Sequence, residues 1–333
     1  MIRPMDWRDF AVLHRMRSHG LCLDSQLDSI RGPDAFHDAL LDPFSRKRNT
    51  CTLISRSDDT DQTIAVGQFT HHIDQVFAHL TFLGPIDVLS QLSGMSLIDA
   101  LSQTAGSQKI QHLIAEIDEA NPAFEILRRA GFAVYARQRI WQRINPPSLD
   151  PKKVSLEWRR ESESDIAAIR SLYHNLVPGL VQQVETPPSS NNRNLVHWHQ
   201  DELLAYLEVI DGSKGIWAQA YFHPAVERTQ DLLMSLLTHL ELTSKKPLYF
   251  CVRSYQAGLN LVLQDLDFQP CSDQAVMVKR LTASMRNRVP TKIRAIEGTQ
   301  PEPTAPISRT ASSSQSAAEI PNHKNLDSNT IYS

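Results

Sequence analysis

The chain has 333 residues, a formal net charge of −3 and 41% hydrophobic residues. This length is enough for about two domains, and the nearly balanced charge gives no reason to expect nucleic acid or a membrane as a partner. No apolar run approaches the ~18 residues that a membrane helix needs, and the first residues lack the apolar core of a signal peptide. The four cysteines form no CxxC pair, so neither a metal site nor a disulfide framework is predicted. We therefore expect a cytoplasmic protein.

Strand-like and helical patterns follow one another along residues 1–144 and predict a mixed α+β domain. The expected order is a strand, two helices, three strands, a helix, a strand, a helix and a final strand. A proline in the first turn and a glycine beyond the end mark the last of these helices. In chain order the predicted elements cover 1–4, 6–17, 35–41, 51–55, 64–71, 76–83, 92–105, 114–117, 121–130 and 132–141.

The segment from Asn121 to Phe132 resembles a motif of the GNAT (Gcn5-related N-acetyltransferase) superfamily. The Asn, the Ala at position 123, the Gly131-Phe132 pair and the helix length between them match the family pattern, and so does the order of elements. One position departs from it: many members carry a Tyr four residues before the Gly, where it protonates the leaving thiolate, and this chain has Leu127. The resemblance covers residues 1–144 and implies a GNAT-like acyltransferase domain.

A proline-rich linker at 145–153 is followed by a second copy of the pattern over 154–281. Phe268 lies 136 positions after Phe132, and the residues before it repeat the same strand, helix and turn. Asp267 replaces the Gly, and Leu263 occupies the Tyr position, so this second GNAT-like domain is degenerate. Residues 282–333 are rich in Ser, Thr, Pro, Asn and Gln, and we expect a disordered tail because such a segment buries little apolar area.

The resemblance implies acetyl-CoA as co-substrate, bound in the split between two central parallel strands. Phosphate binding there would use backbone N–H groups at a helix start, with glycine allowing close approach. In the first half, Gln91, Gly94, Met95 and Ser96 preserve part of the family pattern, with an ordinary loop and helix cap as the alternative; Asn121 would face the cofactor. The second half has no glycine in the corresponding region, so cofactor binding at 225–228 is disfavoured.

Acid–base candidates lie on the strands that would border this split. His79 and Glu116 are the predicted catalytic residues, and Asp118 shares a strand face with Glu116. The structural alternative, which we weigh more heavily, is that Glu116 and Asp118 cap the next helix or pair with Arg128 and Arg137. The His71-His72 pair is expected to be a solvated strand end without a third metal ligand.

Several polar residues of the second half lie at predicted strand ends: Tyr221, His223, Arg253 and Tyr255. They are candidates for substrate binding, with a role in the interface between the two domains as the alternative.

The sequence is compatible with two functions. The first is an acyl-CoA-dependent N-acyltransferase, in which the first half binds the cofactor and an unidentified small-molecule or peptide amine is the acceptor. The second is a non-catalytic binding or scaffold protein derived from the GNAT fold, favoured by Leu127 and Leu263.

Overall fold

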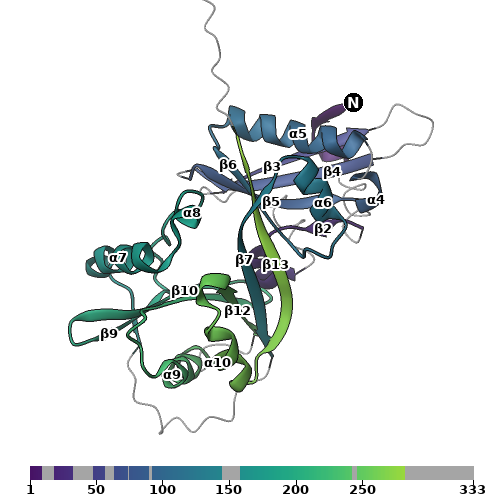
Figure 1. The fold of residues 1–333 in the computed structure, drawn as a ribbon. Coiled ribbons are helices and arrows are strands. Elements are labelled where there is room, and N and C mark those ends of the chain that lie inside the picture. Colours follow the sequence, from purple (N-terminus) through teal and green to yellow (C-terminus); the bar gives the residue numbers. More distant parts are fainter. Residues whose placement is uncertain are drawn as a thin grey trace, which may run out of the picture. The chain divides into compact units, whose positions relative to one another are not determined.

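A mixed sheet of 13 strands is the central feature of the computed structural model (Figure 1). The structure describes residues 1–9, 19–32, 48–56, 64–73, 75–89, 92–144, 158–241 and 246–281. The predicted helix at 35–41, most of the one at 6–17, the linker at 145–153 and the tail lie outside these ranges. None of the described helices has the length and apolar character needed to cross a membrane.

The first half contributes seven strands and four α-helices within the described ranges. The other predicted strands and helices are found here with shifted ends, while β2, α2 and α4 were not predicted. The elements are β1 (Ile2–Pro4), β2 (Leu21–Cys22), α2 (Ser25–Arg31), β3 (Arg48–Arg56), β4 (Ile64–His72), β5 (Phe77–Gly84), α4 (Ile86–Leu89), α5 (Leu92–Ser107), β6 (His112–Ile117), α6 (Ala123–Arg129) and β7 (Ala133–Arg143), with a 3-10 turn η1 at Trp7–Asp9.

The second half repeats this order, which confirms the predicted mixed α+β architecture in both copies. Its elements are β8 (Arg159–Arg160), η3 (Glu163–Asp165), α7 (Ile166–Leu176), α8 (Gly179–Gln182), β9 (Leu195–His199), β10 (Glu202–Asp211), β11 (Ile216–Phe222), α9 (Thr229–Glu241), β12 (Leu248–Arg253), η4 (Ser254–Gln256), α10 (Leu259–Asp265) and β13 (Gln269–Arg280).

The last strands of the two halves are exchanged. The sheet order is β1-β3-β4-β5-β6-β13-β7-β12-β11-β10-β9-β8, so β13 of the second half lies between β6 and β7 of the first. β7 in turn pairs antiparallel with β12, with Trp141 opposite Phe250. Figure 1 shows β7 and β13 running side by side as long strands. The two halves therefore share one hydrogen-bonded ladder within the compact unit Met1–Met285.

The apolar core follows the same exchange. One cluster packs α5 and α6 on the first-half strands and includes Met277 of β13. A second packs α9 and α10 on the second-half strands and includes Trp141 of β7. A third joins Phe77 and Ile114 to side chains of α7 and β10. Because apolar burial is the main favourable term in folding, each half is stabilised by residues that the other half supplies.

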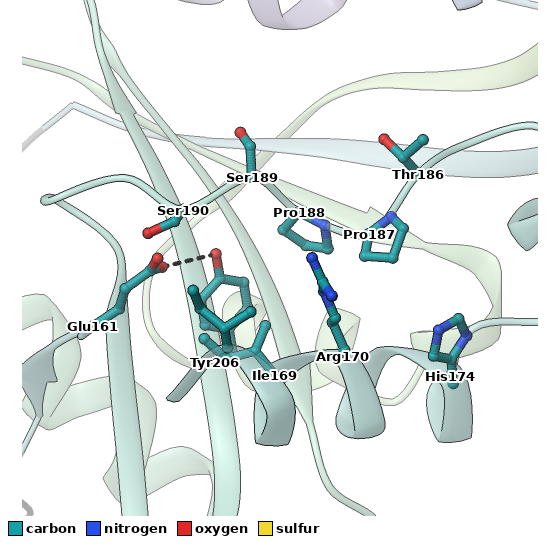
Figure 2. Close-up of a pocket in the computed structure, with 11 residues that line it drawn as sticks. Glu161, Ile169, Arg170, His174, Thr186, Pro187, Pro188, Ser189, Ser190 and Tyr206 are labelled. Atoms are coloured by element: carbon teal, nitrogen blue, oxygen red, sulfur yellow. Dashed lines mark hydrogen bonds between the residues drawn. The ribbon is translucent and has the colours of Figure 1, made fainter. Parts of the chain in front are cut away.

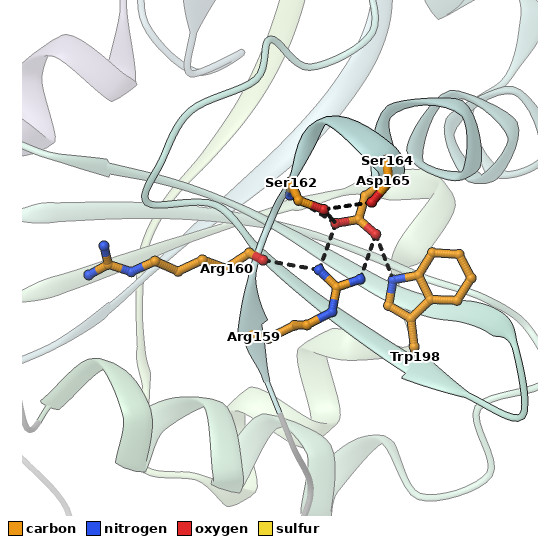
Figure 3. Close-up of polar contacts among 6 residues, drawn as sticks. All are labelled: Arg159, Arg160, Ser162, Ser164, Asp165 and Trp198. Carbon is orange, nitrogen blue, oxygen red and sulfur yellow. Dashed lines mark hydrogen bonds and ion pairs between the residues drawn. The ribbon is translucent and has the colours of Figure 1, made fainter.

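A buried aspartate anchors the first strand of each copy. In the second half, Asp165 is 1% exposed, and the guanidinium of Arg159 donates to its two oxygens at 2.7 and 2.6 Å (Figure 3). The backbone N–H of Ser162 and the indole N–H of Trp198 donate to the same carboxylate, at 2.8 and 3.1 Å. In the first half, Arg3 donates to Asp9 at 2.7 and 2.8 Å in the same way.

These hydrogen bonds hold the pKa of Asp165 well below its usual range, led by the contribution of Arg159. They lower the pKa of Asp9 to about 2, with the hydrogen bond from Arg3 as the largest cause. A lowered pKa in the folded state means that the carboxylate contributes stability above about pH 4 and loses it as the pH falls toward the folded pKa.

We predict that Asp165→Asn lowers the free energy of unfolding at pH 7 by about 1–2 kcal/mol, because the charge-assisted bonds from Arg159 are lost and Arg159 itself is half-exposed. The loss should shrink below about pH 4. Denaturant unfolding at pH 7 and pH 3 measures it. The control is Glu125→Gln, which removes an exposed ion pair with Arg128 and should change little. An equal effect of both substitutions would contradict the anchoring role.

Gly131 ends α6 with φ of +91°, and the matching Asp267 has φ of +62°. A Cβ on Gly131 would meet only the Lys279 side chain at 3.8 Å, so backbone strain and not crowding opposes substitution. We predict that Gly131→Val lowers stability by about 1–3 kcal/mol. Asp267→Gly relieves strain at the equivalent turn and should leave the thermal midpoint unchanged or raise it. A thermal midpoint for Gly131→Val equal to that of the wild type would remove this explanation.

Candidate functional site at the junction of the two halves

The parallel strands of the first half separate, and the chain itself fills the gap between them. β5 and β6 pair only from Phe77↔His112 to His79↔Ile114. Beyond that point, Leu21 and Cys22 of β2 pair with Leu83 and Phe82 of β5. The Leu23 N–H donates to the Thr81 carbonyl at 3.1 Å, and the Glu116 N–H donates to the Leu23 carbonyl at 2.9 Å. The segment at 21–23 therefore bridges the two separating strands.

The second half has the same separation without such a bridge. β11 and β12 pair in parallel from Ile216↔Leu248 to Gln219↔Cys251, and no further pair continues this ladder. β11 runs on to Phe222 and β12 to Arg253. Within the described residues, no strand equivalent to β2 pairs with the end of β11 on this side. The carboxyl ends of separating parallel strands are a common location for ligand sites.

A cavity of about 320 Å³ lies where these two regions meet. We refer to it as the central cavity. Its walls come from both halves, and its polar side chains outnumber its apolar ones. The residues that line it are Asp24, Gln26, Thr70, His71, His72, Gln75, Phe77, His79, Glu116, Gln138, Glu185, Thr186, Pro187, Pro188, Ser189, Asn191, Glu208, Ile210, Trp217, Gln219, Tyr221 and Arg253.

Arg253 is the charged centre of the cavity. It ends β12 and is 6% exposed. One guanidinium nitrogen donates to Glu185 at 2.9 Å, and Tyr135 donates its O–H to the same carboxylate oxygen. Burial opposes the charge, but Glu185 and the other acidic groups hold the pKa of Arg253 well above its usual value. Its Nε and a second terminal nitrogen have no acceptor among the described residues, and unpartnered buried donors are unfavourable.

Two further glutamates in the cavity have perturbed pKa values. Burial raises the pKa of Glu116, and the negative charge of Asp24 adds to that effect. Burial also raises the pKa of Glu208 to about 7, with the charges of Glu185 and Glu161 acting in the same direction. A carboxylate with a pKa near neutrality can accept a proton at physiological pH. Glu208 is therefore the strongest general-base candidate in the cavity.

A chain of polar side chains connects the two halves beneath the cavity. The Ser25 N–H donates to Glu116 at 2.9 Å, and the Ser25 hydroxyl donates to the Gln274 side chain at 2.6 Å. Gln138 donates to the same Gln274 oxygen at 2.9 Å and accepts from the thiol of Cys251 at 3.5 Å. Gln138 and Gln274 lie opposite each other on the exchanged strands, so the strand exchange also fixes the position of Glu116.

A second cavity, of about 480 Å³, shares one wall with the first. Residues 186–189 line both cavities. Figure 2 shows Glu161 bonded to Tyr206 on one side of this second cavity and Arg170 pointing from α7 toward the proline pair. Glu161 also accepts from Asn194 at 2.8 Å, so its carboxylate is held in place by β10 and by the loop before β9.

Four of the residues predicted for catalysis or substrate binding meet in the central cavity: His79, Glu116, Tyr221 and Arg253. The other two predicted substrate residues do not line it. The ring of His223 accepts from the Ala225 N–H at 3.2 Å, and Tyr255 packs against the shared tyrosine-rich core. The prediction that His71 is solvated is wrong, because it is 9% exposed and lines the cavity.

Glu116 and Asp118 do not share the face of one strand as expected, because β6 ends at Ile117. Asp118 follows the end of β6, accepts from the Ala120 N–H at 2.8 Å and lines a different cavity. The expected ion pairs are also different, since Arg137 pairs with Glu119 and Arg128 with Glu125. Of Glu116 and Asp118, only Glu116 lines the central cavity.

The region expected to bind phosphate is helical. Gly94 lies inside α5, and a Cβ there would come within 2.3 Å of the Leu89 carbonyl. Gly94 is therefore required for the close packing of α4 on α5, and a bulky side chain at Gly94 would disrupt the fold. Met95 packs against the core, Ser96 is exposed, and Gln91 lies outside the described residues. Asn121 caps α6 by accepting from the Ala123 N–H at 2.9 Å.

Both positions of the family tyrosine are in the core. Leu127 and Leu263 are 0% exposed and pack in separate apolar clusters. Neither position borders the central cavity. Among the described residues, no group of three or more His, Cys, Asp or Glu side chains is arranged to hold a metal ion.

Solved structures share this architecture. A GCN5-related N-acetyltransferase from Sphaerobacter thermophilus superimposes with a TM-score of 0.53 at 11% identity, over 84% of this chain and 95% of that one. A tandem GNAT protein from the clavulanic acid biosynthesis pathway superimposes with a TM-score of 0.51 at 13% identity, over 85% and 98% of the two chains. The chain has the tandem GNAT fold. No model of a protein family matches the sequence, and neither does any curated protein.

The GNAT resemblance seen in the sequence is thus confirmed for the fold. Several residues of the central cavity were not predicted: Glu185, Glu208, Gln138 and Gln219. Glu185 follows α8 in a proline-containing loop that has no helical or strand pattern. Glu208 and Gln219 face each other on β10 and β11. Their position within two strand-like, largely apolar runs was the signal that could have identified them, because buried polar groups need partners.

We predict opposite stability effects for two cavity glutamates. Glu185→Gln leaves the buried Arg253 without its closest counter-charge and should lower stability by about 3 kcal/mol. Glu208→Gln removes a carboxylate whose raised pKa shows that the folded state disfavours its charge. It should raise the thermal midpoint at pH 8 and change it little at pH 5. Destabilisation of the same size by both substitutions would contradict this account of the charges.

Proposed function

We propose that this protein is an acyl-CoA-dependent N-acyltransferase that acylates an amine bound in the central cavity. The observation that carries the proposal is the position of Glu208 and Arg253 in a buried cavity at the open end of β11 and β12. A base with a pKa of about 7 and a cation with unpartnered N–H groups are what acyl transfer to an amine requires. Both compared structures, a GCN5-related N-acetyltransferase and a tandem GNAT protein, agree with this chemistry.

The geometry favours acyl-CoA binding in the second half, in contrast to the sequence-based preference for the first. The segment at 21–23 occupies the hydrogen-bonding edges of β5 and β6 that an extended ligand would use. In the part of the chain that the structure describes, no such segment lies between the ends of β11 and β12. α9 begins beyond β11, so its first-turn N–H groups and the neighbouring Arg228 are the groups that would hold a pyrophosphate.

Acetyl-CoA would supply an activated thioester at the end of this split. Glu208 would take the proton that the ammonium group of the acceptor must lose before nitrogen can attack. The free N–H groups of Arg253 would stabilise negative charge on the acyl oxygen. Burial holds the pKa of Tyr221 well above its usual value, so its hydroxyl stays protonated and can donate to the departing sulfur.

A second candidate function is a binding protein that uses the same cavity without chemistry. The observation that favours it is the loss of both tyrosine positions to buried Leu127 and Leu263, together with the filled split in the first half. The two functions differ in one measurable property, because only the enzyme requires affinity for acyl-CoA.

We predict that titration calorimetry detects acetyl-CoA binding and that Arg228→Ala weakens it about tenfold, since a phosphate-neutralising charge is lost at the start of α9. The control is Ser96→Leu, which adds bulk at an exposed position near the start of α5 in the first half and should leave the affinity unchanged. Loss of affinity in Ser96→Leu alone would place the cofactor in the first half. No detectable affinity in the wild type would favour the binding protein.

The pH dependence tests the role of Glu208. Because the deprotonated carboxylate is the active form, kcat/KM for acyl transfer should rise as pH increases and level off above about pH 7. Glu208→Gln should lower kcat by at least about 100-fold and abolish this acidic limb. Glu161→Gln, which removes a neighbouring negative charge from outside the cavity, should move the limb to lower pH. An unchanged profile in Glu208→Gln would exclude Glu208 as the base.

A further inference from the structure

The second cavity is lined by one acidic and one basic side chain that are not paired with each other. Of the described residues around it, Glu161 is the only carboxylate and Arg170 the only Arg or Lys. Arg170 has no hydrogen bond or ion pair with any other described residue. The ring of His174, which also lines the cavity, is already bonded to the Gln182 side chain at 2.8 Å. Figure 2 shows Glu161 beside Tyr206 and the Arg170 side chain apart from both.

The carboxylate of Glu161 is only partly satisfied by the protein. Its Oε2 accepts from the Asn194 side chain at 2.8 Å and from the Tyr206 hydroxyl at 3.2 Å. Its Oε1 is buried and has no donor among the described residues. A buried acceptor without a donor is unfavourable. A ligand with an ammonium group would supply both the missing donor and a balancing charge.

Apolar side chains line the space between these two charged groups. Ile169 and Arg170 follow Ile166 by three and four positions, so the three residues lie on one side of α7. Pro187 and Pro188 line the same cavity from the loop that follows α8. The volume of about 480 Å³ is suited to a small molecule. Such walls favour a ligand with an aliphatic portion between or beside its polar groups.

We propose that the second cavity binds a small aliphatic amino acid, with its ammonium group on Glu161 and its carboxylate on Arg170. A zwitterion supplies the donor that Glu161 lacks and the acceptor that Arg170 lacks, and it adds no net charge to the cavity. Its aliphatic side chain would contact the isoleucine and proline walls. Glu208 and Arg253 do not line this cavity, so binding here goes beyond the proposed acyl transfer and does not depend on it.

The test is titration calorimetry on the full-length protein with three probes that differ by one charged group. L-leucine has both groups, 3-methylbutylamine lacks the carboxylate, and 4-methylpentanoate lacks the amino group. We expect leucine to bind at least about tenfold more tightly than either analogue, because each removed group forfeits a charge-assisted hydrogen bond. No binding of leucine, or an affinity for either analogue equal to that for leucine, would overturn the proposal.

Two substitutions assign the two ends of the ligand. Arg170→Gln should weaken leucine binding about tenfold and leave 3-methylbutylamine within about twofold, because only leucine has a carboxylate to lose its partner. Glu161→Gln should weaken leucine and 3-methylbutylamine but not 4-methylpentanoate. The matched controls are Arg160→Gln and Glu163→Gln, which remove the same charges from exposed neighbours outside the cavity and should leave all affinities unchanged. Equal losses in the controls would overturn the assignment.

A substitution in the central cavity shows which of the two cavities holds the ligand. Glu208→Gln should leave leucine affinity unchanged, because Glu208 does not line the second cavity. Loss of affinity in Glu208→Gln with none in Glu161→Gln would place the amino acid in the central cavity and overturn the proposal. Thermal melting checks that each variant is folded. Arg170 is exposed, so Arg170→Gln remains a decisive test even if Glu161→Gln does not fold.

This site and the proposed function can fail separately, because leucine binding is measured without acetyl-CoA. A protein that binds acetyl-CoA but shows no preference for leucine over its analogues would retain the acyltransferase function and lose the second site. A protein that selects leucine through Glu161 and Arg170 but does not bind acetyl-CoA would be an amino-acid-binding protein with the GNAT fold.

Discussion

The exchange of β7 and β13 is the constraint on which the site depends. Each of these strands completes the sheet of the other half, and they pair with each other from Gln269↔Gln142 to Val278↔Ala133. Only two strands, β13 and β7, lie between β6 of the first half and β12 of the second. Glu116 and Arg253, which are far apart in sequence, therefore line the same cavity. Separated halves would each lack a strand and part of a core.

Both copies have the Arg–Asp pair that holds the first strand, but they differ at the point where their two parallel strands separate. The bonds of Arg3 to Asp9 recur 156 positions later as those of Arg159 to Asp165. Phe132 and Phe268 are separated by only 136 positions, so the second copy is shorter between the two anchors. The Arg–Asp pair fixes the position of the first strand in each copy. The turn at Gly131 or Asp267 fixes where the last strand begins. Part of the difference in length falls where the first copy has β2 across its split, and a similar part falls between the two strands that follow.

Local patterns predicted most elements because alternation and helical spacing are properties of neighbouring residues. The turn at Gly131 and its repeat at Asp267 could be predicted because a left-handed residue leaves a compositional signal. The two-residue strand β2 could not, because it is too short to have a period. The strand exchange could not either, since β7 and β13 have similar patterns and only their long-range partners distinguish the two arrangements.

The same difference between local patterns and long-range contacts applies to the residues of the site. Arg253 and Tyr221 were predicted from their places at strand ends, and Glu116 and His79 from the parallel strands. His71 was taken as solvated because it lies at the end of a strand, and the sequence does not show that its ring is buried beside Phe69. Glu185 was missed because it lies in a polar loop, and its role is visible only through its bond to Arg253.

The central claim is that the ligand site lies at the open split of the second half and not at the filled split of the first. Amide hydrogen exchange of the full-length protein with and without acetyl-CoA tests this most directly. The account predicts slower exchange at the end of β11 and the start of α9, over residues 220–231. It predicts no change at the end of β5 or the start of α5, over residues 81–97. Slower exchange confined to residues 81–97 would contradict it.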